Sequence, residues 1–284
     1  MLRIVMDSAG DMPPGWDEEY GISVIPVNIH FREETYLQGV DLNDEQFYRM
    51  ARESGTFPQT SQPTPQQFVD FYNKIAEPGD TILSIHVTGK LSGTLASAEL
   101  ASRQLRGTYN VLAIDSGCGS ATQGMMCRDA RRLDRQGATP EEIVAWIATI
   151  RPQVSIYLTL DTLEFARRSG RVKALQAALA SLLNIKPIVA LNDGVLDMSD
   201  RVRTRSKALD FVLESTRQRL GGRLSKVAVV HAQDPESAEI LLEGARRELN
   251  CQELIMTKLS IGVAANLGPG TVGIAAYPAI QAAS

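Results

Sequence analysis

The sequence predicts an α/β protein in two parts. Over the first half, short β-branched and apolar runs alternate with helical segments that carry their own start signals, a pattern typical of βαβ units around a parallel sheet. Beyond residue 152, hairpin signals appear among the strands, which favours a mixed sheet. We therefore expect an N-terminal α/β/α domain over residues 1–152 and a C-terminal mixed-sheet α/β domain over 153–284.

The N-terminal elements follow from apolar runs and capping signals. Two helices are predicted where a threonine precedes a proline, from Thr64 and from Thr139. Gln67 and Glu142 follow three residues after each threonine, which completes a capping box in both cases. The predicted strands are 2–6, 23–31, 81–87 and 110–115.

The C-terminal elements include hairpins. Segment 174–191 is expected to form a helix and then a strand, and the strand enters a turn at Asp193-Gly194, a pair that suits type I′ hairpins. A third capped helix is predicted from Asp234, and Arg201, Arg203 and Arg205 alternate, as on one face of a strand. The remaining predicted strands are 154–160, 226–232 and 253–260.

Composition restricts the class of protein. With 284 residues, 44% apolar and 22% charged, the chain resembles an ordinary soluble globular protein, and its net charge of −4 argues against nucleic acid as a partner. The three cysteines form no CxxC pair, and no metal-ligand spacing occurs, so we expect no metal. The N-terminus lacks a secretory pattern, and Asn184, Lys186 and Pro187 interrupt the most apolar segment. We expect a cytoplasmic protein without an integral membrane segment.

Hydroxyl side chains gather where predicted strands end. The stretch 84–101, SIHVTGKLSGTLASAELA, leads from a strand through Gly89, Ser92, Gly93 and Thr94 into a helix. Such a junction can bind an anion, although Ser92 and Thr94 could equally serve to cap the helix. Thr60 and Ser61 lie upstream of the predicted N-cap residue Thr64, and neither has an obvious structural role. Similar clusters occur at 7–11, 59–65 and 115–120.

The nature of these donors indicates the anion. They are hydroxyls and backbone N–H groups, and the phosphate-binding motif GxxxxGK[ST] is absent, so a single carboxylate suits them better than a triphosphate. The segment 268–273, GPGTVG, fits GxGxxG, but only eleven residues follow it and a proline lies inside it, so we do not interpret it as a dinucleotide site.

Two further hypotheses concern catalysis and docking. A serine hydrolase acting on a lipid or small ester would use Ser92 as nucleophile and His86 as base, although GxSxG is missing. The arginines of RRSGR (167–171) and RVRTR (201–205) form either a solvated face or a docking surface for an acidic or phosphorylated partner.

Six segments in order resemble the DegV family, which includes the fatty-acid-binding subunits of bacterial fatty acid kinase. MDSAGDMPP resembles the family's DSxxDLP, TSQPTPQQF its TSQPSPxxF, and TGKLSGT its SSxLSGT. DTLEFARRSGR, LLNIKPIVAL and RVRTRSKAL are similar to its DxLExLxRGGR, LLNIKPIL and KVRxRxKAL. The resemblance covers essentially the whole chain.

The resemblance implies a two-domain carrier that holds one long-chain fatty acid, such as palmitate, stearate or oleate, between its domains. It implies that Thr60 and Ser92 bind the carboxylate, with Ser61 and Gly93 adjacent. Where family members with the segment GTHTGPG have a histidine, this chain has Asn266, which can donate a hydrogen bond but carries no charge.

The resemblance also implies how such a carrier acts. It would have no catalytic site of its own and no cofactor besides the bound fatty acid. It would present the carboxylate to a separate fatty acid kinase for phospholipid synthesis, and we expect the docking residues to be Arg167, Arg168, Arg171 and Arg203.

Overall fold

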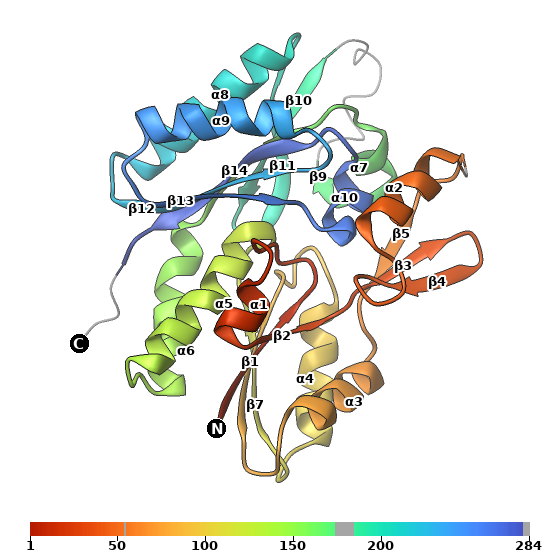
Figure 1. Ribbon diagram of the computed structural model, residues 1–284, viewed down its shortest axis with the longest axis vertical. Coiled ribbons are helices and arrows are strands. Elements are labelled where there is room, and N and C mark those ends of the chain that lie inside the picture. Colours follow the sequence, from red (N-terminus) through yellow and green to blue (C-terminus); the bar gives the residue numbers. More distant parts are fainter. Residues whose placement is uncertain (54, 174–184, 281–284) are drawn as a thin grey trace.

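The computed structural model describes residues 1–53, 55–173 and 185–280 and contains three sheets (Figure 1). The first is a four-stranded parallel sheet in the order β2-β1-β6-β7, formed by β1 (Leu2–Asp7), β2 (Ile22–Ile25), β6 (Thr81–His86) and β7 (Asn110–Asp115). The helix expected at the start of 174–191 lies outside the described residues.

Helices cover both faces of the parallel sheet, because alternate residues of each strand point to opposite sides. Val5 and Ile82 pack with α3 (Pro65–Ile75) and α4 (Thr94–Gln104) on one face. Ile4 and Leu83 face the other side, where the covering helices are α1 (Trp16–Tyr20), α5 (Ser120–Arg135) and α6 (Pro140–Ile150).

The C-terminal sheet is mixed, as expected. Its seven strands run in the order β13-β12-β14-β8-β10-β11-β9, with parallel pairs at both edges and antiparallel pairs between them. They are β8 (Ser155–Thr159), β9 (Val172–Lys173), β10 (Lys186–Asn192), β11 (Val195–Val202), β12 (Ser225–His231), β13 (Cys251–Lys258) and β14 (Val272–Pro278). One face is covered by α8 (Arg205–Leu220) and α9 (Pro235–Glu248) (Figure 1).

The other face of the mixed sheet packs toward α5, so α5 and α6 are shared between the two sheets. One hydrophobic cluster runs from Leu83 of β6 through Met125 of α5 to Ala275 of β14. The chain passes from one sheet to the other through a 3₁₀ turn, η1 (Arg151–Gln153). Because one hydrophobic core spans both sheets, the division of the chain into domains at 1–152 and 153–284 stays a proposal.

The prediction of a single strand over residues 23–31 is wrong. This segment breaks at Pro26 into β2 and β3 (Asn28–Phe31), and β3 joins β4 (Glu34–Leu37) and β5 (Gln59–Ser61) in a separate antiparallel sheet. Proline has no N–H to donate to a neighbouring strand, so the change of sheet occurs there. The helix α2 (Asp44–Glu53) lies between β4 and β5.

The local signals of the sequence are confirmed. Thr64 and Thr139 each form a complete capping box, and Asp234 caps α9. Asp193 and Gly194 have φ of 47° and 74°, the left-handed values that a type I′ turn requires. Among the described residues, no helix is long and apolar enough to cross a membrane.

The expectation of one arginine face at 201–205 is wrong. Strand β11 ends at Val202, so only Arg201 lies on it. Arg205 begins α8 and donates from Nη2 to the backbone carbonyl of Gly270 at 2.7 Å. Arg203 lies exposed between the two elements.

Candidate functional site

A cavity of about 180 Å³ opens where the two halves of the chain meet, at the carboxyl end of the parallel sheet. The strand order reverses between β1 and β6, and such a reversal leaves a crevice beyond the strand ends. Ala9 follows β1 and Val87 follows β6, and both line the cavity. The opposite wall is formed by the mixed-sheet half, chiefly by α10 (Ile261–Leu267).

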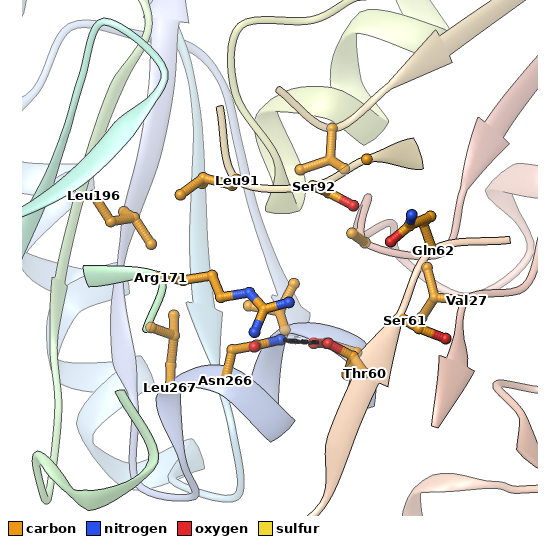
Figure 2. Close-up of a pocket in the computed structure, with 15 residues that line it drawn as sticks. Val27, Thr60, Ser61, Gln62, Leu91, Ser92, Arg171, Leu196, Asn266 and Leu267 are labelled. Carbon is orange, nitrogen blue, oxygen red and sulfur yellow. Dashed lines mark hydrogen bonds between the residues drawn. The ribbon is translucent and has the colours of Figure 1, made fainter. Parts of the chain in front are cut away.

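The cavity brings together all five residues that were predicted to bind a carboxylate. Its lining includes Gly93 and, as Figure 2 shows, Thr60, Ser61, Ser92 and Asn266. They come from β5, from the loop that precedes α4 and from α10. The structure thus places the predicted polar residues around one space, while their roles remain a prediction.

Thr60 and Ser61 point to opposite sides of β5, because successive strand residues alternate. The Thr60 hydroxyl accepts a hydrogen bond from Asn266 Nδ2 at 3.3 Å, and this bond joins the two walls of the cavity (Figure 2). The Ser61 hydroxyl instead lies 2.7 Å from His30 Nε2. Of the two, Thr60 is the better placed to contact a ligand.

Ser92 serves the start of α4 as well as the cavity. Its Oγ lies 2.8 Å from Thr94 Oγ1 and accepts a hydrogen bond from the Thr94 backbone N–H at 3.3 Å. The N-cap residue itself is Gly93, which has no side chain to cap the helix. A Cβ at position 93 would lie 2.8 Å from the end of the Gln62 side chain, so Gly93 and Gln62 lie close together at the cavity.

Arg171 contradicts one expectation. The cavity donors were expected to be neutral, yet the Arg171 side chain lines the cavity and extends toward Asn266 and Thr60 (Figure 2). Its docking role stays a prediction. Its Nη1 also donates to the Ser169 carbonyl at 2.6 Å. Gly170, with φ of 68°, ends α7 (Glu164–Ser169) and turns the chain toward the cavity. The polar end of the cavity therefore carries a positive charge.

The rest of the lining is largely aliphatic. Val27, Leu91, Leu196, Val263 and Leu267 contribute apolar side chains from both halves of the chain. An anion-binding end next to an aliphatic wall suits an amphipathic ligand with one acidic group.

A second, more polar cavity of about 660 Å³ adjoins the first and shares Thr60, Arg171 and Asn266 with it. Arg168 lines this second cavity, where its guanidinium lies 4.1 Å from the centre of the Phe57 ring. Arg167 and Arg203 are exposed. Arg168 is exposed as well, although it lines the second cavity, and the docking role of the four arginines stays a prediction.

His86 is not positioned to activate Ser92. It is fully buried, with Nδ1 3.0 Å from Asp7 Oδ2 and Nε2 2.7 Å from Ser84 Oγ. The Ser84 hydroxyl is in turn 2.7 Å from Tyr72 OH, whose pKa is raised by burial. Both ring nitrogens are thus engaged in a core network, and the geometry gives the hydrolase hypothesis no support.

The glycine-rich segment 268–273 forms a tight turn between α10 and β14. Gly268 and Gly270 have positive φ, and a Cβ at either position would collide with Phe165 or Asp161. The close approach serves packing of the turn against the segment 161–165. Within the described ranges, no group of three or more His, Cys, Asp or Glu residues could hold a metal ion.

Comparison of the sequence with known proteins finds a family model and relatives that name the same family. Residues 1–279 match the family model described as "Uncharacterised protein, DegV family". A DegV domain-containing protein of Deinococcus radiodurans is 32% identical over 281 residues, which is 98% of each chain.

Two solved structures are similar over nearly the whole chain. A DegV family protein from Thermus thermophilus, described for its fatty acid binding, has a TM-score of 0.90 and 31% identity, and the match covers 98% of this chain and 99% of that one. DegV of Bacillus subtilis, described as a fatty acid binding protein, has a TM-score of 0.85 and 29% identity, with 97% and 98% covered.

Proposed function

Because this chain belongs to the DegV family, we propose that it binds one long-chain fatty acid in the cavity between its two halves. The carboxylate would be held by Thr60, Ser92, Arg171 and Asn266. The observation that carries the proposal is the lining of the 180 Å³ cavity, where hydroxyl, amide and guanidinium groups from separate segments face a common space next to aliphatic side chains. The proteins of Thermus thermophilus and Bacillus subtilis, each described as binding fatty acid, support it.

The energetics assign different roles to the two ends of the ligand. At about 0.8 kcal/mol per buried CH₂, a tail of roughly fourteen methylenes contributes on the order of 10 kcal/mol before the costs of association. Each hydrogen bond to the carboxylate adds about 1.5–3 kcal/mol. The tail therefore dominates the affinity, and the polar residues decide which end of the ligand enters the polar part of the cavity.

Mass spectrometry of lipids extracted from the purified protein tests the proposal. We expect a co-purified acyl chain, and thermal stabilisation of delipidated protein by palmitate, stearate or oleate. Thr60→Val and Ser92→Ala should each weaken palmitate binding. Ser102→Ala is the matched control for Ser92, because Ser102 lies on α4, outside the cavity lining, and its hydroxyl donates to the Glu99 carbonyl. Absence of both an acyl chain and stabilisation refutes the proposal.

We further propose that the protein is a carrier, without a catalytic site of its own, that presents the carboxylate to a separate acyl kinase for phospholipid synthesis. The family resemblance implies this role, and we propose that the protein acts in the cytoplasm. Arg167 and Arg203 are exposed, and Arg168 lines the polar cavity beside the carboxylate end, so these three are the candidates for kinase contact. Arg167→Glu or Arg203→Glu should lower phosphorylation by the kinase and leave palmitate binding unchanged. Loss of both functions, or of neither, contradicts the docking role.

A further inference from the structure

The side chain of Asn266 connects α10 to β5 at the polar end of the cavity. Its Nδ2 donates to the Gly262 carbonyl at 2.7 Å, within α10, and to Thr60 Oγ1 at 3.3 Å, on β5 (Figure 2). An amide nitrogen carries two hydrogens, so these two bonds use both of them. Asn266 therefore keeps no hydrogen for a ligand in the cavity.

The orientation of this amide is set by the Gly262 carbonyl. A carbonyl oxygen only accepts, so a reversed amide would place two oxygens 2.7 Å apart. Gly262 is itself held from the N-terminal half, because its N–H donates to Gln38 Oε1 at 2.9 Å and Gln38 Nε2 donates to the Ser8 carbonyl at 3.0 Å. Contacts within the protein thus fix the direction of the Asn266 amide.

The bond from Asn266 determines how the Thr60 hydroxyl can act. A threonine hydroxyl has one hydrogen to donate, and its oxygen can accept. Since the Thr60 oxygen accepts from Asn266, its hydrogen points away from that amide, and Thr60 lines the cavity. A hydroxyl that accepts one hydrogen bond also donates a stronger one, because successive bonds polarise each other. Thr60 is therefore prepared to donate to an acceptor in the cavity.

We propose that Asn266 is a positioning residue for the carboxylate site: it donates to the Thr60 oxygen, directs the Thr60 hydrogen to the carboxylate, and does not contact the ligand itself. This rests on the proposed function, since the acceptor is the carboxylate of the fatty acid. Asn266 thus belongs to the four residues assigned above, but it acts on the carboxylate through Thr60.

The alternative role for Asn266 is a direct hydrogen bond to the carboxylate. That bond needs one of the two Nδ2 hydrogens, so the amide would have to release either the Gly262 carbonyl or Thr60. The two roles differ in one measurable respect. An indirect effect of Asn266 disappears when Thr60 has no hydroxyl, whereas a direct effect remains.

A double-mutant cycle between Asn266 and Thr60 separates the two roles. The Kd for palmitate is measured by isothermal titration of delipidated wild type, Asn266→Leu, Thr60→Val and the double variant. Without the amide, the Thr60 hydroxyl rotates among three staggered positions, of which one suits the ligand, so the Kd should rise at least about threefold. In the Thr60→Val background, the same substitution should change the Kd by less than about twofold.

Two further variants make the cycle decisive. Asn266→Ala repeats it with a smaller side chain, so a poor fit of leucine does not determine the result. Asn250→Leu is the matched control, because the Asn250 amide also donates to a glycine carbonyl, that of Gly222, but is exposed and lies outside both cavities. Equal losses with and without the Thr60 hydroxyl, or no loss from either Asn266 variant, overturn the proposal.

Nuclear magnetic resonance of delipidated protein tests the bond to Thr60 without a ligand. Thr60→Val should shift the signal of one Nδ2 hydrogen of Asn266 and leave the other, which faces the Gly262 carbonyl, nearly unchanged. If neither signal shifts, Asn266 does not direct Thr60, and the proposal is overturned whatever the affinity for palmitate. Wild-type protein that binds no palmitate overturns the proposed function instead, and the resonance measurement still decides whether Asn266 directs Thr60.

Discussion

Replacing Arg171 by glutamine should weaken the binding of palmitate much more than the binding of hexadecanol. The two ligands share a sixteen-carbon chain and differ in the charge of the head group. Arg171 lies at the polar end of the cavity, and its guanidinium is the positive charge among the lining residues (Figure 2). The substitution removes that charge and keeps a polar side chain of similar reach.

The magnitude follows from the difference between charged and neutral hydrogen bonds. A bond between ionised groups contributes about 1.5–3 kcal/mol and a neutral one about 0.5–1.5 kcal/mol, so the loss for palmitate should be about 1–2 kcal/mol. This corresponds to a Kd that is about five- to thirtyfold higher. Hexadecanol should lose less than about threefold, because its hydroxyl gains little from a charged partner.

Isothermal titration of delipidated protein with each ligand measures the two constants. Arg167→Gln is the matched control, since Arg167 is exposed on α7, outside the cavity lining, and should change neither constant. An equal loss for palmitate and hexadecanol would show that Arg171 acts on the shape of the cavity rather than on the carboxylate. No loss for palmitate would refute a contact between Arg171 and the head group.

Three further predictions concern stability, each measured by urea unfolding. Thr64→Ala removes a capping box and should lower the free energy of unfolding by about 1 kcal/mol, with palmitate affinity unchanged because Thr64 is not a cavity residue. Asp80 accepts hydrogen bonds from the N-terminal ammonium and from Arg3, which hold the pKa of its carboxyl below its ordinary value. Its contribution should be present at neutral pH and disappear as the pH falls through the acidic range, and Asp80→Asn should remove that dependence; a variant with the wild-type pH profile contradicts this. Asp11 has a raised folded-state pKa of about 7, so its effect has the opposite sign: stability should fall by at most about 4 kcal/mol as the pH rises from about 4 to about 7, and Asp11→Asn should abolish the fall.

Local signals in the sequence determined the parts of the structure that depend on neighbouring residues. The capping boxes at Thr64 and Thr139 and the turn at Asp193-Gly194 appear where they were predicted, because each is a contact within a few residues of the chain. The place of Ser92 could be found in a similar way, since it follows the parallel strand β6 and side chains beyond such strand ends meet at one edge of a sheet. Thr60 was assigned from the family resemblance, because it lies on β5 of the separate antiparallel sheet.

Only the tertiary structure decided which distant residues complete the cavity. Arg171 follows the short helix α7, and no sequence pattern indicates that its side chain lines the cavity. It does so because Gly170 turns the chain toward the cavity. Pro26 divides one apolar run between two sheets, so β3 pairs with the strand that carries Thr60. The contact of Asp11 with Ser260 joins residues 249 positions apart. A sequence pattern records the period of a helix or strand, whereas the pairing of such distant groups is fixed by how the core packs as a whole.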